Sequence, residues 1–302
     1  MSFTHSPVTR VAAIHDLSGF GRTSLTVAIP VFSTMGIQIC PLPTAVLSSE
    51  TGAFEDFAFV DLSAHLTDFM GHWQRLGLKF DAVYSGFLAS PAQAGLVHEC
   101  MQSMLLPGGL AVVDPVLGDN GKLDPTQTRE MVESMRWLIR RVGCVTPNLT
   151  EAALLLDEPM PEAALDQQNK TIDEKLAKKW LVRLAEMGPS YVVITSVPLA
   201  GGRKNESAVI AYNSKEDRFW KVAFEYIPVF YPGTGDTFAS VLTSCLLTGD
   251  SLPMAMGRAV QFVSLAIKTT FGHGTPPREG IMLEKALGSL RLPVASSSYE
   301  IF

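Results

Sequence analysis

The chain has 302 residues, of which 47% are hydrophobic and 18% charged, and it carries a formal net charge of −6. This composition is typical of a globular protein and excludes a disordered or fibrous chain. No basic stripe is visible, so we expect no nucleic-acid partner. The four cysteines lie far apart without a C-x-x-C pair, which argues against a zinc site or a disulfide framework.

The beginning of the chain carries no recognisable targeting signal. Residues 1–10 are polar and lack the apolar stretch of a secretory signal. No apolar run approaches the length that a membrane-spanning helix needs. We therefore expect a cytoplasmic protein with no membrane partner.

Short apolar runs rich in β-branched residues alternate with helical patterns along the chain, which is typical of βαβ units around a mainly parallel sheet. Strands are predicted, in chain order, at 11–15, 39–42, 82–85, 110–114, 143–146, 191–195, 208–212 and 220–224. Helices are predicted at 23–35, 64–76, 91–104, 125–142, 150–156, 172–187, 237–248 and 252–270. The last two strands predict a hairpin, hence an antiparallel sheet edge. We expect one domain over residues 1–302.

Small, polar and acidic residues recur where the predicted strands end. In open α/β sheets, ligands bind outside the carboxyl ends of the strands. The pattern therefore predicts a cleft at that edge of the sheet. The residues at the strand ends are Asp16, Thr44 to Thr51, Ser85 to Phe87, Asp114, Thr146 to Asn148, Thr195 and Ser196.

The most informative motif is the glycine-rich turn Gly233-Thr234-Gly235-Asp236, which leads into an amphipathic helix. One interpretation is structural: the glycines form a tight turn and Asp236 caps the helix. The other is catalytic: backbone amides stabilise a transferring phosphoryl group while Asp236 accepts the proton of an alcohol. The motif alone does not decide between them.

Two further motifs allow similar alternatives. The segment from Asn148 to Glu151 has the spacing of a capping box, and its side chains could also hold waters around Mg²⁺; the motif alone favours the cap. Asp114 ends a predicted strand and could approach a metal or a phosphate. Residues 118–121 then predict either a turn or a mobile flap.

The first strand is followed by glycines and a helix, as in a dinucleotide-binding fingerprint. The match fails because Ser24 stands in place of the third glycine and no acidic residue ends the second strand. No P-loop is present either. These departures argue against a nicotinamide-dependent dehydrogenase, and any nucleotide must be held in a third way.

Seven segments occur together in the order and spacing of one family. The chain resembles the pyridoxal/pyridoxamine (vitamin B6) kinases of the ribokinase-like superfamily over nearly its whole length. The segments are I-H-D-L-S-G-F-G-R at 14–22, T-A-V-L-S-S-E-T-G at 44–52, D-A-V-Y-S-G-F-L at 81–88, V-D-P-V-L-G-D at 113–119, T-P-N-L-T-E at 146–151, V-V-I-T-S at 192–196 and G-T-G-D at 233–236.

The resemblance implies a three-layer α/β/α fold, a homodimer, Mg²⁺, and ATP as phosphoryl donor to the 5′-hydroxymethyl group of a B6 vitamer; a monovalent cation stays open. By the same resemblance, the catalytic base is Asp236 and the anion hole is Gly233, Thr234 and Gly235. The resemblance also implies which residues bind the ligands. Phosphate and nucleotide contacts fall on Asp114, Thr146, Asn148, Glu151, Thr195 and Ser196, and the metal ligands would be Asp114 and Glu151. Asp119 matches a residue of a flap over the nucleotide and substrate, and the pyridine ring would be lined by Asp16, Thr51 and Phe87.

Two departures from the family bear on the substrate. Asp16 stands where these kinases usually carry Ser, and Phe87 where many carry Tyr. An acid beside the ring substituents favours an amine, so we expect a preference for pyridoxamine.

Two other functions remain open. One is a hydroxymethylpyrimidine kinase of the same superfamily, although those enzymes usually carry Cys where this chain has Asp236. The other is a ligand-binding protein without catalysis, against which the retained Asp236 argues.

Overall fold

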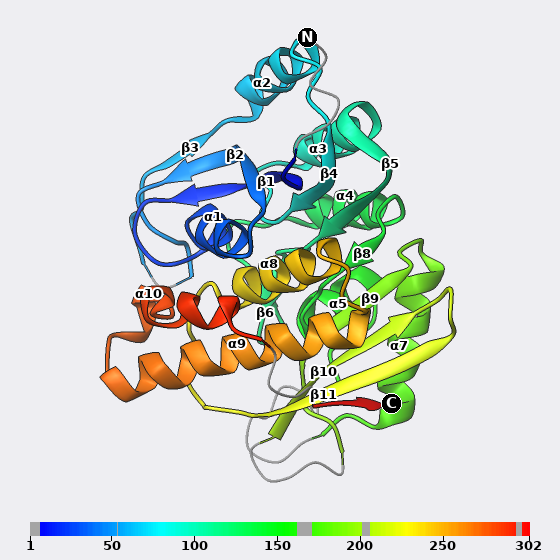
Figure 1. Cartoon of the computed structure of the whole chain (residues 1–302). Coiled ribbons are helices and arrows are strands. Elements are labelled where there is room, and N and C mark those ends of the chain that lie inside the picture. Colours follow the sequence, from blue (N-terminus) through cyan, green and yellow to red (C-terminus); the bar gives the residue numbers. More distant parts are fainter. Residues whose placement is uncertain (1–6, 53, 162–170, 201–205, 294–297) are drawn as a thin grey trace.

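The computed structural model describes residues 7–52, 54–161, 171–200, 206–293 and 298–302 (Figure 1). One ten-stranded sheet runs through the molecule. Its strands are β1 (Arg10–Ser18), β2 (Gln38–Leu47), β3 (Phe59–Asp61), β4 (Phe80–Ser85), β5 (Leu105–Val113), β8 (Cys144–Val145), β9 (Tyr191–Val197), β10 (Glu206–Asn213), β11 (Arg218–Glu225) and β12 (Tyr299–Ile301). Their order is β12-β11-β10-β9-β8-β5-β4-β1-β2-β3.

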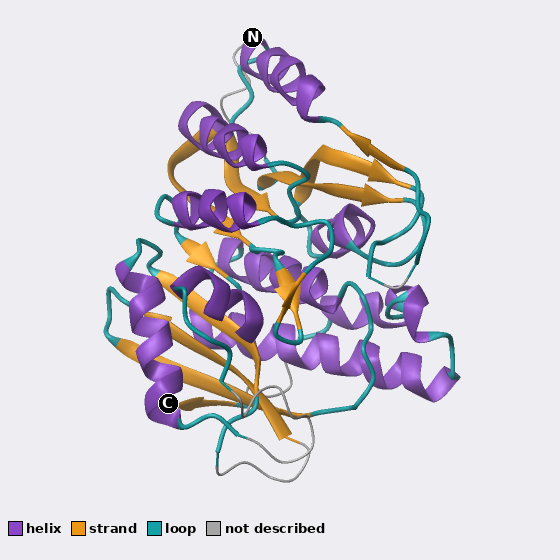
Figure 2. Cartoon of the chain, turned by 180° about the vertical axis from the view of Figure 1, so that it is seen from behind, coloured by secondary structure: helices purple, strands orange, loops and turns teal. Residues whose placement is uncertain are grey.

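Helices cover both faces of this sheet (Figure 2). The helices on one face are α2 (Ser63–Arg75), α3 (Pro91–Met104), α4 (Arg129–Ile139), α5 (Leu149–Leu156) and α7 (Glu174–Glu186). On the other face lie α1 (Ser24–Thr34), α8 (Thr234–Leu247), α9 (Leu252–His273) and α10 (Leu283–Ala286), with short 3₁₀ turns at Pro277–Glu279 and Leu287–Arg291. The predicted three-layer α/β/α fold is thereby confirmed.

The central strands contain unbroken apolar runs because both of their faces are covered. In β1, Val11 and Ala13 pack against the helices of the α1 and α8 layer. Ala12 and Ile14 pack into the opposite layer, and all four side chains are buried. Such strands are readily predicted from the sequence, because an unbroken apolar run distinguishes them from the loops around them.

The six strands from β2 to β9 in the middle of the sheet run parallel. The predicted hairpin of β10 and β11 is present, so this edge is antiparallel as expected. The strands β3 and β12 were not predicted, and each has only three residues. β2 continues through Pro41 and Pro43. These prolines are tolerated because β2 pairs only with β1 at these positions, whereas β3 pairs with Ala45 to Leu47.

Residues 118–121, predicted as a turn or a flap, form a short hairpin of β6 (Gly118–Asp119) and β7 (Lys122–Leu123). Both turn residues, Asn120 and Gly121, have positive φ angles of 51° and 75°, as tight hairpins require.

α4 is shorter than predicted because Thr128 caps it by accepting a hydrogen bond from the N–H of Met131.

Among the helices of the described residues, none combines the length and the apolar character that crossing a membrane requires.

Candidate active site

A cleft of about 270 Å³ opens at the carboxyl ends of the parallel strands. The loops after β1, β2, β4, β5, β8 and β9 line it together with the start of α8. Every residue that the sequence assigned to the site lies in its wall. These residues are Asp16, Thr51, Phe87, Asp114, Asp119, Thr146, Asn148, Glu151, Thr195, Ser196, Gly233, Thr234, Gly235 and Asp236.

The structural interpretation of Asp236 as a helix cap is wrong. α8 begins at Thr234 and its N-cap is Gly233, which has a φ of +80°. A Cβ atom on Gly233 would lie 1.9 Å from the carbonyl oxygen of Arg22, so only glycine fits at this position. Asp236 therefore belongs to the first helical turn, where unpaired backbone N–H groups and the helix dipole favour anions.

Two contacts hold the carboxylate of Asp236. Its Oδ2 accepts a hydrogen bond of 2.7 Å from the backbone N–H of Ser24. Its Oδ1 lies 2.8 Å from Nε2 of His15. Ser24 adopts a left-handed φ of +56°, which costs free energy in a residue other than glycine. The chain thus accepts local strain at a residue that positions this carboxylate.

Asp114 and Glu151 form a pair of buried carboxyl groups next to Asp236. Burial, and then the charge of Asp236, raises the pKa of Asp114 to about 7. Burial, followed by the charge of Asp114, raises the pKa of Glu151 well above its ordinary value. Thr146 Oγ1 donates a hydrogen bond of 2.9 Å to Asp114 Oδ1. A carboxyl group whose pKa is raised by burial and by a neighbouring carboxylate gains stability from a nearby cation.

The capping box predicted from Asn148 and Glu151 is present. Asn148 Oδ1 accepts from the N–H of Glu151, and Glu151 Oε2 accepts from the N–H of Asn148. Asn148 Nδ2 also donates to the carbonyl oxygen of Gly118, and Thr150 Oγ1 accepts from the N–H of Gly121. The start of α5 therefore anchors the β6–β7 hairpin, and with it Asp119, above the cleft.

At the end of β9, Ser196 has a left-handed φ of +57°. Thr195 forms a parallel bridge with Asn148, and its N–H donates to the carbonyl oxygen of Pro147. These contacts bring the ends of β8 and β9 together at one side of the cleft.

Asp16, Thr51 and Phe87 lie together in the cleft wall on the side of β1, β2 and β4. Phe87 is buried, and its carbonyl oxygen accepts a hydrogen bond from Thr44 Oγ1. Asp16 already uses both carboxylate oxygens, since Oδ1 lies 2.9 Å from His15 Nδ1 and Oδ2 accepts from Ser18 Oγ. The expected preference for pyridoxamine stays a prediction.

The sequence did not single out His15, Ser24, Glu50 or Phe230, although they also line the cleft. His15 follows an apolar strand and precedes an acid, a signal that could have identified it. Ser24 acts through its backbone and Glu50 lies in a loop, so neither pattern nor periodicity marks them.

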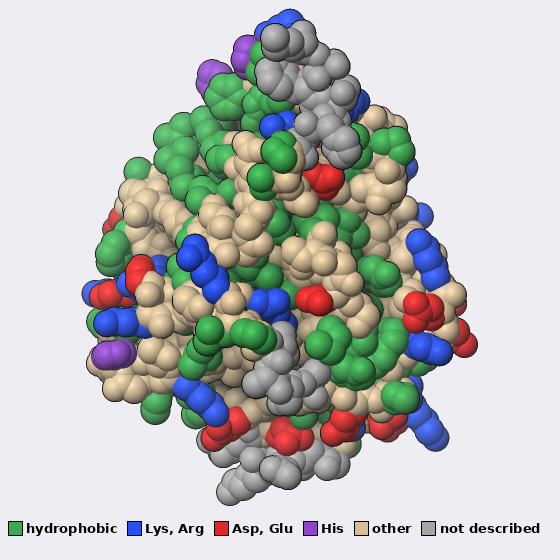
Figure 3. Space-filling view, in the orientation of Figure 1, with side chains coloured by type: hydrophobic (Ala, Val, Ile, Leu, Met, Phe, Trp, Pro, Cys, Tyr) green, Lys and Arg blue, Asp and Glu red, His purple; other side chains and the backbone are tan. Residues whose placement is uncertain are grey.

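The electrostatic character of the cleft is strongly acidic. Among the described residues that line it, none is Lys or Arg. The outer surface differs, because on the face shown in Figure 3 charges of both signs are interspersed. An anionic ligand in the cleft must therefore rely on helix N-termini and on cations that it brings along. The seven acids of the wall are Asp16, Glu50, Asp114, Asp119, Asp124, Glu151 and Asp236.

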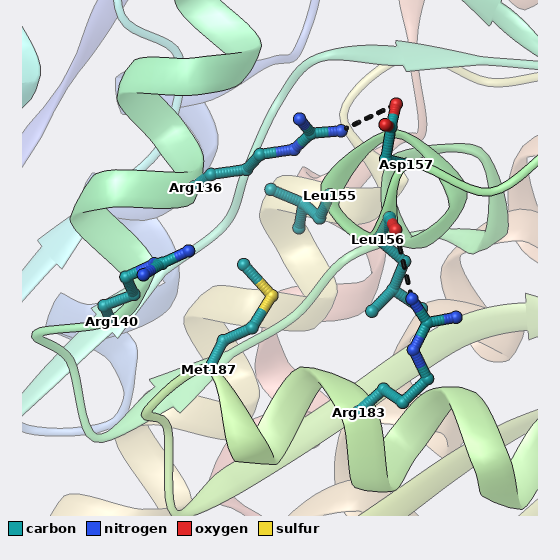
Figure 4. A pocket seen from close by; sticks show the side chains of 7 residues that line it. All are labelled: Arg136, Arg140, Leu155, Leu156, Asp157, Arg183 and Met187. Carbon is teal, nitrogen blue, oxygen red and sulfur yellow. Dashed lines mark hydrogen bonds and ion pairs between the residues drawn. The ribbon is translucent and has the colours of Figure 1, made fainter.

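A second hollow lies where α4, α5 and α7 end, and three arginines surround it (Figure 4). Two of them are already engaged: Arg136 donates to the carbonyl oxygen of Leu154, and Arg183 to that of Leu156. Both contacts neutralise the C-terminus of α5. The hollow is thus explained by the packing of helix ends, and the catalytic candidates all lie in the first cleft.

Known proteins share both the sequence and the fold. The profile of the family described as phosphomethylpyrimidine kinase matches residues 28–279. A Bacteroides thetaiotaomicron protein, described as a candidate phosphomethylpyrimidine kinase and solved with pyridoxal, is 47% identical over 98% of this chain and 100% of its own, with a TM-score of 0.91.

Two other relatives carry different names. The pyridoxal kinase of Lactobacillus plantarum is 32% identical over 94% of this chain and 97% of its own, with a TM-score of 0.82. The hydroxymethylpyrimidine/phosphomethylpyrimidine kinase of Bacillus subtilis is 25% identical over 88% of this chain and 84% of its own. The chain therefore belongs to the phosphomethylpyrimidine kinase family, within the ribokinase-like superfamily of kinases.

Proposed function

We propose that this protein transfers the terminal phosphoryl group of ATP to the 5′-hydroxymethyl group of a B6 vitamer. The observation that carries the proposal is the carboxylate of Asp236, which is held from two sides in the first turn of α8 at the edge of the cleft. The acceptor is supported by the relative solved with pyridoxal. In this proposal, the side chain of Asp16 determines which of pyridoxal, pyridoxamine and pyridoxine is preferred.

In this proposal Asp236 accepts the proton of the hydroxymethyl group as its oxygen bonds to phosphorus. The transferring phosphoryl group lies against the start of α8, where the N–H groups of Thr234 and Gly235 have no partner within the helix. These amides are fixed before the reaction and stabilise the charge that spreads over the phosphoryl oxygens. Ser24 and His15 keep the base in place throughout.

Asp114 and Glu151 would hold Mg²⁺, because each is buried and each has a raised pKa that a cation would relieve. No cluster of three or more His, Cys, Asp or Glu side chains suited to a metal occurs among the described residues. A magnesium ion here would complete its shell with waters and phosphate oxygens, as this ion prefers. It would offset the negative charge of the phosphates. Thr146, Asn148, Thr195, Ser196 and Asp119 would contact the nucleotide beside it.

The second candidate acceptor is a hydroxymethylpyrimidine. The family description and the Bacillus subtilis relative favour it. Asp236 argues for the B6 vitamer, since hydroxymethylpyrimidine kinases usually carry Cys there.

We further propose that residues 1–302 act as one domain and that the protein is a cytoplasmic homodimer. Sedimentation of the purified protein should then show twice the monomer mass.

An ATP-consumption assay with pyridoxal, pyridoxamine, pyridoxine, hydroxymethylpyrimidine and simple sugars tests the acceptor. We expect the highest kcat/KM for a B6 vitamer, with pyridoxamine ahead of pyridoxal if Asp16 acts on the ring substituents. A higher kcat/KM for hydroxymethylpyrimidine would overturn the B6 assignment, and a sugar as best acceptor would overturn both.

The role of Asp236 is tested by Asp236→Asn. The amide keeps the shape of the side chain but cannot accept the proton, so kcat should fall by about three orders of magnitude or more. The affinity for ATP, measured by titration calorimetry, should stay within about threefold. A loss of less than tenfold in kcat would show that another group is the base.

A further inference from the structure

Three buried side chains form a continuous row that ends at the proposed base. His15 is 1% exposed and lies between two carboxylates. Its Nδ1 is 2.9 Å from Oδ1 of Asp16, and its Nε2 is 2.8 Å from Oδ1 of Asp236. Asp16 is held in turn by Ser18. The row joins the end of β1 to the first turn of α8, two segments that lie far apart in the sequence.

The imidazole ring has no freedom to turn. A Cβ atom on Gly86 would lie 2.1 Å from both Cδ2 and Nε2 of His15, so the backbone of residue 86 packs directly on the ring. The ring of Tyr84 lies 6.0 Å away, centroid to centroid. The glycine that follows β4 therefore serves to admit the histidine, and the histidine is held in a single orientation.

The orientation fixes which atom donates to Asp236. A carboxylate can only accept, so Nε2 carries a hydrogen and donates it to Oδ1. On the other side, the N–H groups of Asp16 and Phe87 approach Nδ1 at 3.0 and 3.2 Å, next to the Asp16 carboxylate. Either a protonated Nδ1 donates to Asp16 or a bare Nδ1 accepts from the two amides, and in both states Nε2–H points to Asp236.

We propose that His15, backed by Asp16, is a positioning residue that orients the Asp236 carboxylate through the hydrogen bond from Nε2–H. This inference rests on the proposed function, because it assumes that Asp236 is the base. Such a donor is needed because Asp236 also faces Asp114, and the cleft wall is otherwise acidic. Without it, the carboxylate would keep one hydrogen bond, from the N–H of Ser24.

The charges around the ring favour its protonated form. Burial alone would lower the pKa of His15, but the charge of Asp236 and the hydrogen bonds to Asp16 and Asp236 raise it to about 10. The other titratable groups that face this row are Asp114, which follows β5, and Tyr84 on β4. Burial and the nearby carboxylates hold the pKa of Tyr84 well above its ordinary value, so it stays neutral.

The test separates the hydrogen bond of His15 from its charge. His15→Gln can still donate an N–H to Asp236 but carries no charge, whereas His15→Ala provides neither. We expect kcat to follow the hydrogen bond, because a base that is not oriented accepts the proton of the alcohol less efficiently. At the pH optimum, His15→Gln should keep kcat within about tenfold of wild type, and His15→Ala should lose about 100-fold, with the KM for ATP unchanged in each.

A histidine with a structural role alone would lower thermal stability and reduce kcat equally in His15→Gln and His15→Ala, and equal losses in the two variants overturn the proposal. His65→Gln, at an exposed position of α2, is the matched control and should leave kcat unchanged. Gly86→Ala reaches the same ring from the other side and should also lower kcat.

A second measurement does not depend on turnover. Crystal structures of the wild type, His15→Gln and His15→Ala show the orientation of the Asp236 carboxylate. We expect Oδ1 to keep its place in His15→Gln and to turn away from residue 15 in His15→Ala, even if the protein phosphorylates another alcohol. An unchanged carboxylate in His15→Ala would overturn the role of His15, while a wild type inactive on every acceptor would overturn only the proposed function.

Discussion

The buried carboxyl group of Asp114 destabilises the folded protein when it is ionised. Its pKa is raised from 3.8 to about 7, first by burial and then by the charge of Asp236. A carboxyl group whose pKa is raised on folding supports the folded state below its unfolded pKa and loses that support as the pH rises through the folded pKa. The ligand-free protein should therefore lose stability between about pH 4 and pH 7 on account of this side chain.

Asp114→Asn should accordingly stabilise the ligand-free protein while removing activity. The amide cannot ionise, so the free energy of unfolding at pH 8 should rise by roughly 2–4 kcal/mol. Urea unfolding at pH 5 and pH 8 measures this, and the gain should shrink towards pH 5. Asp68→Asn, at an exposed position of α2, is the control, and an equal gain at both pH values would contradict the linkage to Asp114.

At the scale of elements, α8 has a glycine with positive φ at each end, but only one of them is enclosed. Gly233 has a φ of +80° and its backbone packs on Arg22, whereas Gly249 has a φ of +96° and open space around it. A side chain would therefore cause similar backbone strain at the two ends. Only at Gly233 would it also collide with neighbouring atoms. The pair allows the two effects to be separated within one helix.

Gly249→Ala should cost about 1 kcal/mol of stability through its φ angle alone and leave kcat unchanged. Gly233→Ala should cost about 3 kcal/mol or more, because its Cβ collides with the backbone of residue 22. It should also lower kcat by about 100-fold, since the first turn of α8 must shift. Thermal unfolding and steady-state kinetics measure both, and equal effects at the two ends would refute the steric explanation.

The two strands of the main sheet that the sequence did not predict share a physical reason. β3 and β12 are three residues long and lie at the edges of the sheet, with exposed side chains. Such strands are defined by their hydrogen bonds to a neighbour, and no apolar run marks them. The buried strands β1, β4 and β9 were predicted because their run of apolar residues reflects the two layers that cover them.

The same distinction holds for the site. Its named residues could be placed at one sheet edge because a parallel topology brings strand ends together. The contact between His15 and Asp236 joins residues 221 positions apart, and no local pattern specifies such a pair. The strain at Ser24 and the close approach of Gly86 to the ring are likewise tertiary features, which become visible only when the layers are assembled.

At the scale of the whole molecule, the net charge of −6 and the acidic cleft act in the same direction. Both repel a free polyphosphate. The three helix N-termini at the cleft, of α1, α5 and α8, offset only part of this repulsion, since each contributes about half an elementary charge. Binding of ATP should therefore depend on divalent cations that accompany it.

Removal of Mg²⁺ with a chelator should lower the affinity for ATP by about 100-fold or more, because the phosphates then face seven carboxyl groups without a counterion. Titration calorimetry with ATP measures this effect. Adenosine lacks the phosphates and is the control, so its weak binding should not change. Equal affinity for ATP with and without Mg²⁺ would show that the cleft holds phosphate by some other means.

The strand β12 has a consequence for handling the protein. Its residues Tyr299 to Ile301 pair with Trp220 to Val222 of β11 at one edge of the sheet. The ring of Phe302 is buried, and the Lys178 ammonium group lies 4.9 Å from its centroid. A protease that clipped residues 298–302 would remove the partner of this part of β11, and the free N–H and C=O groups of the strand would invite pairing with another chain.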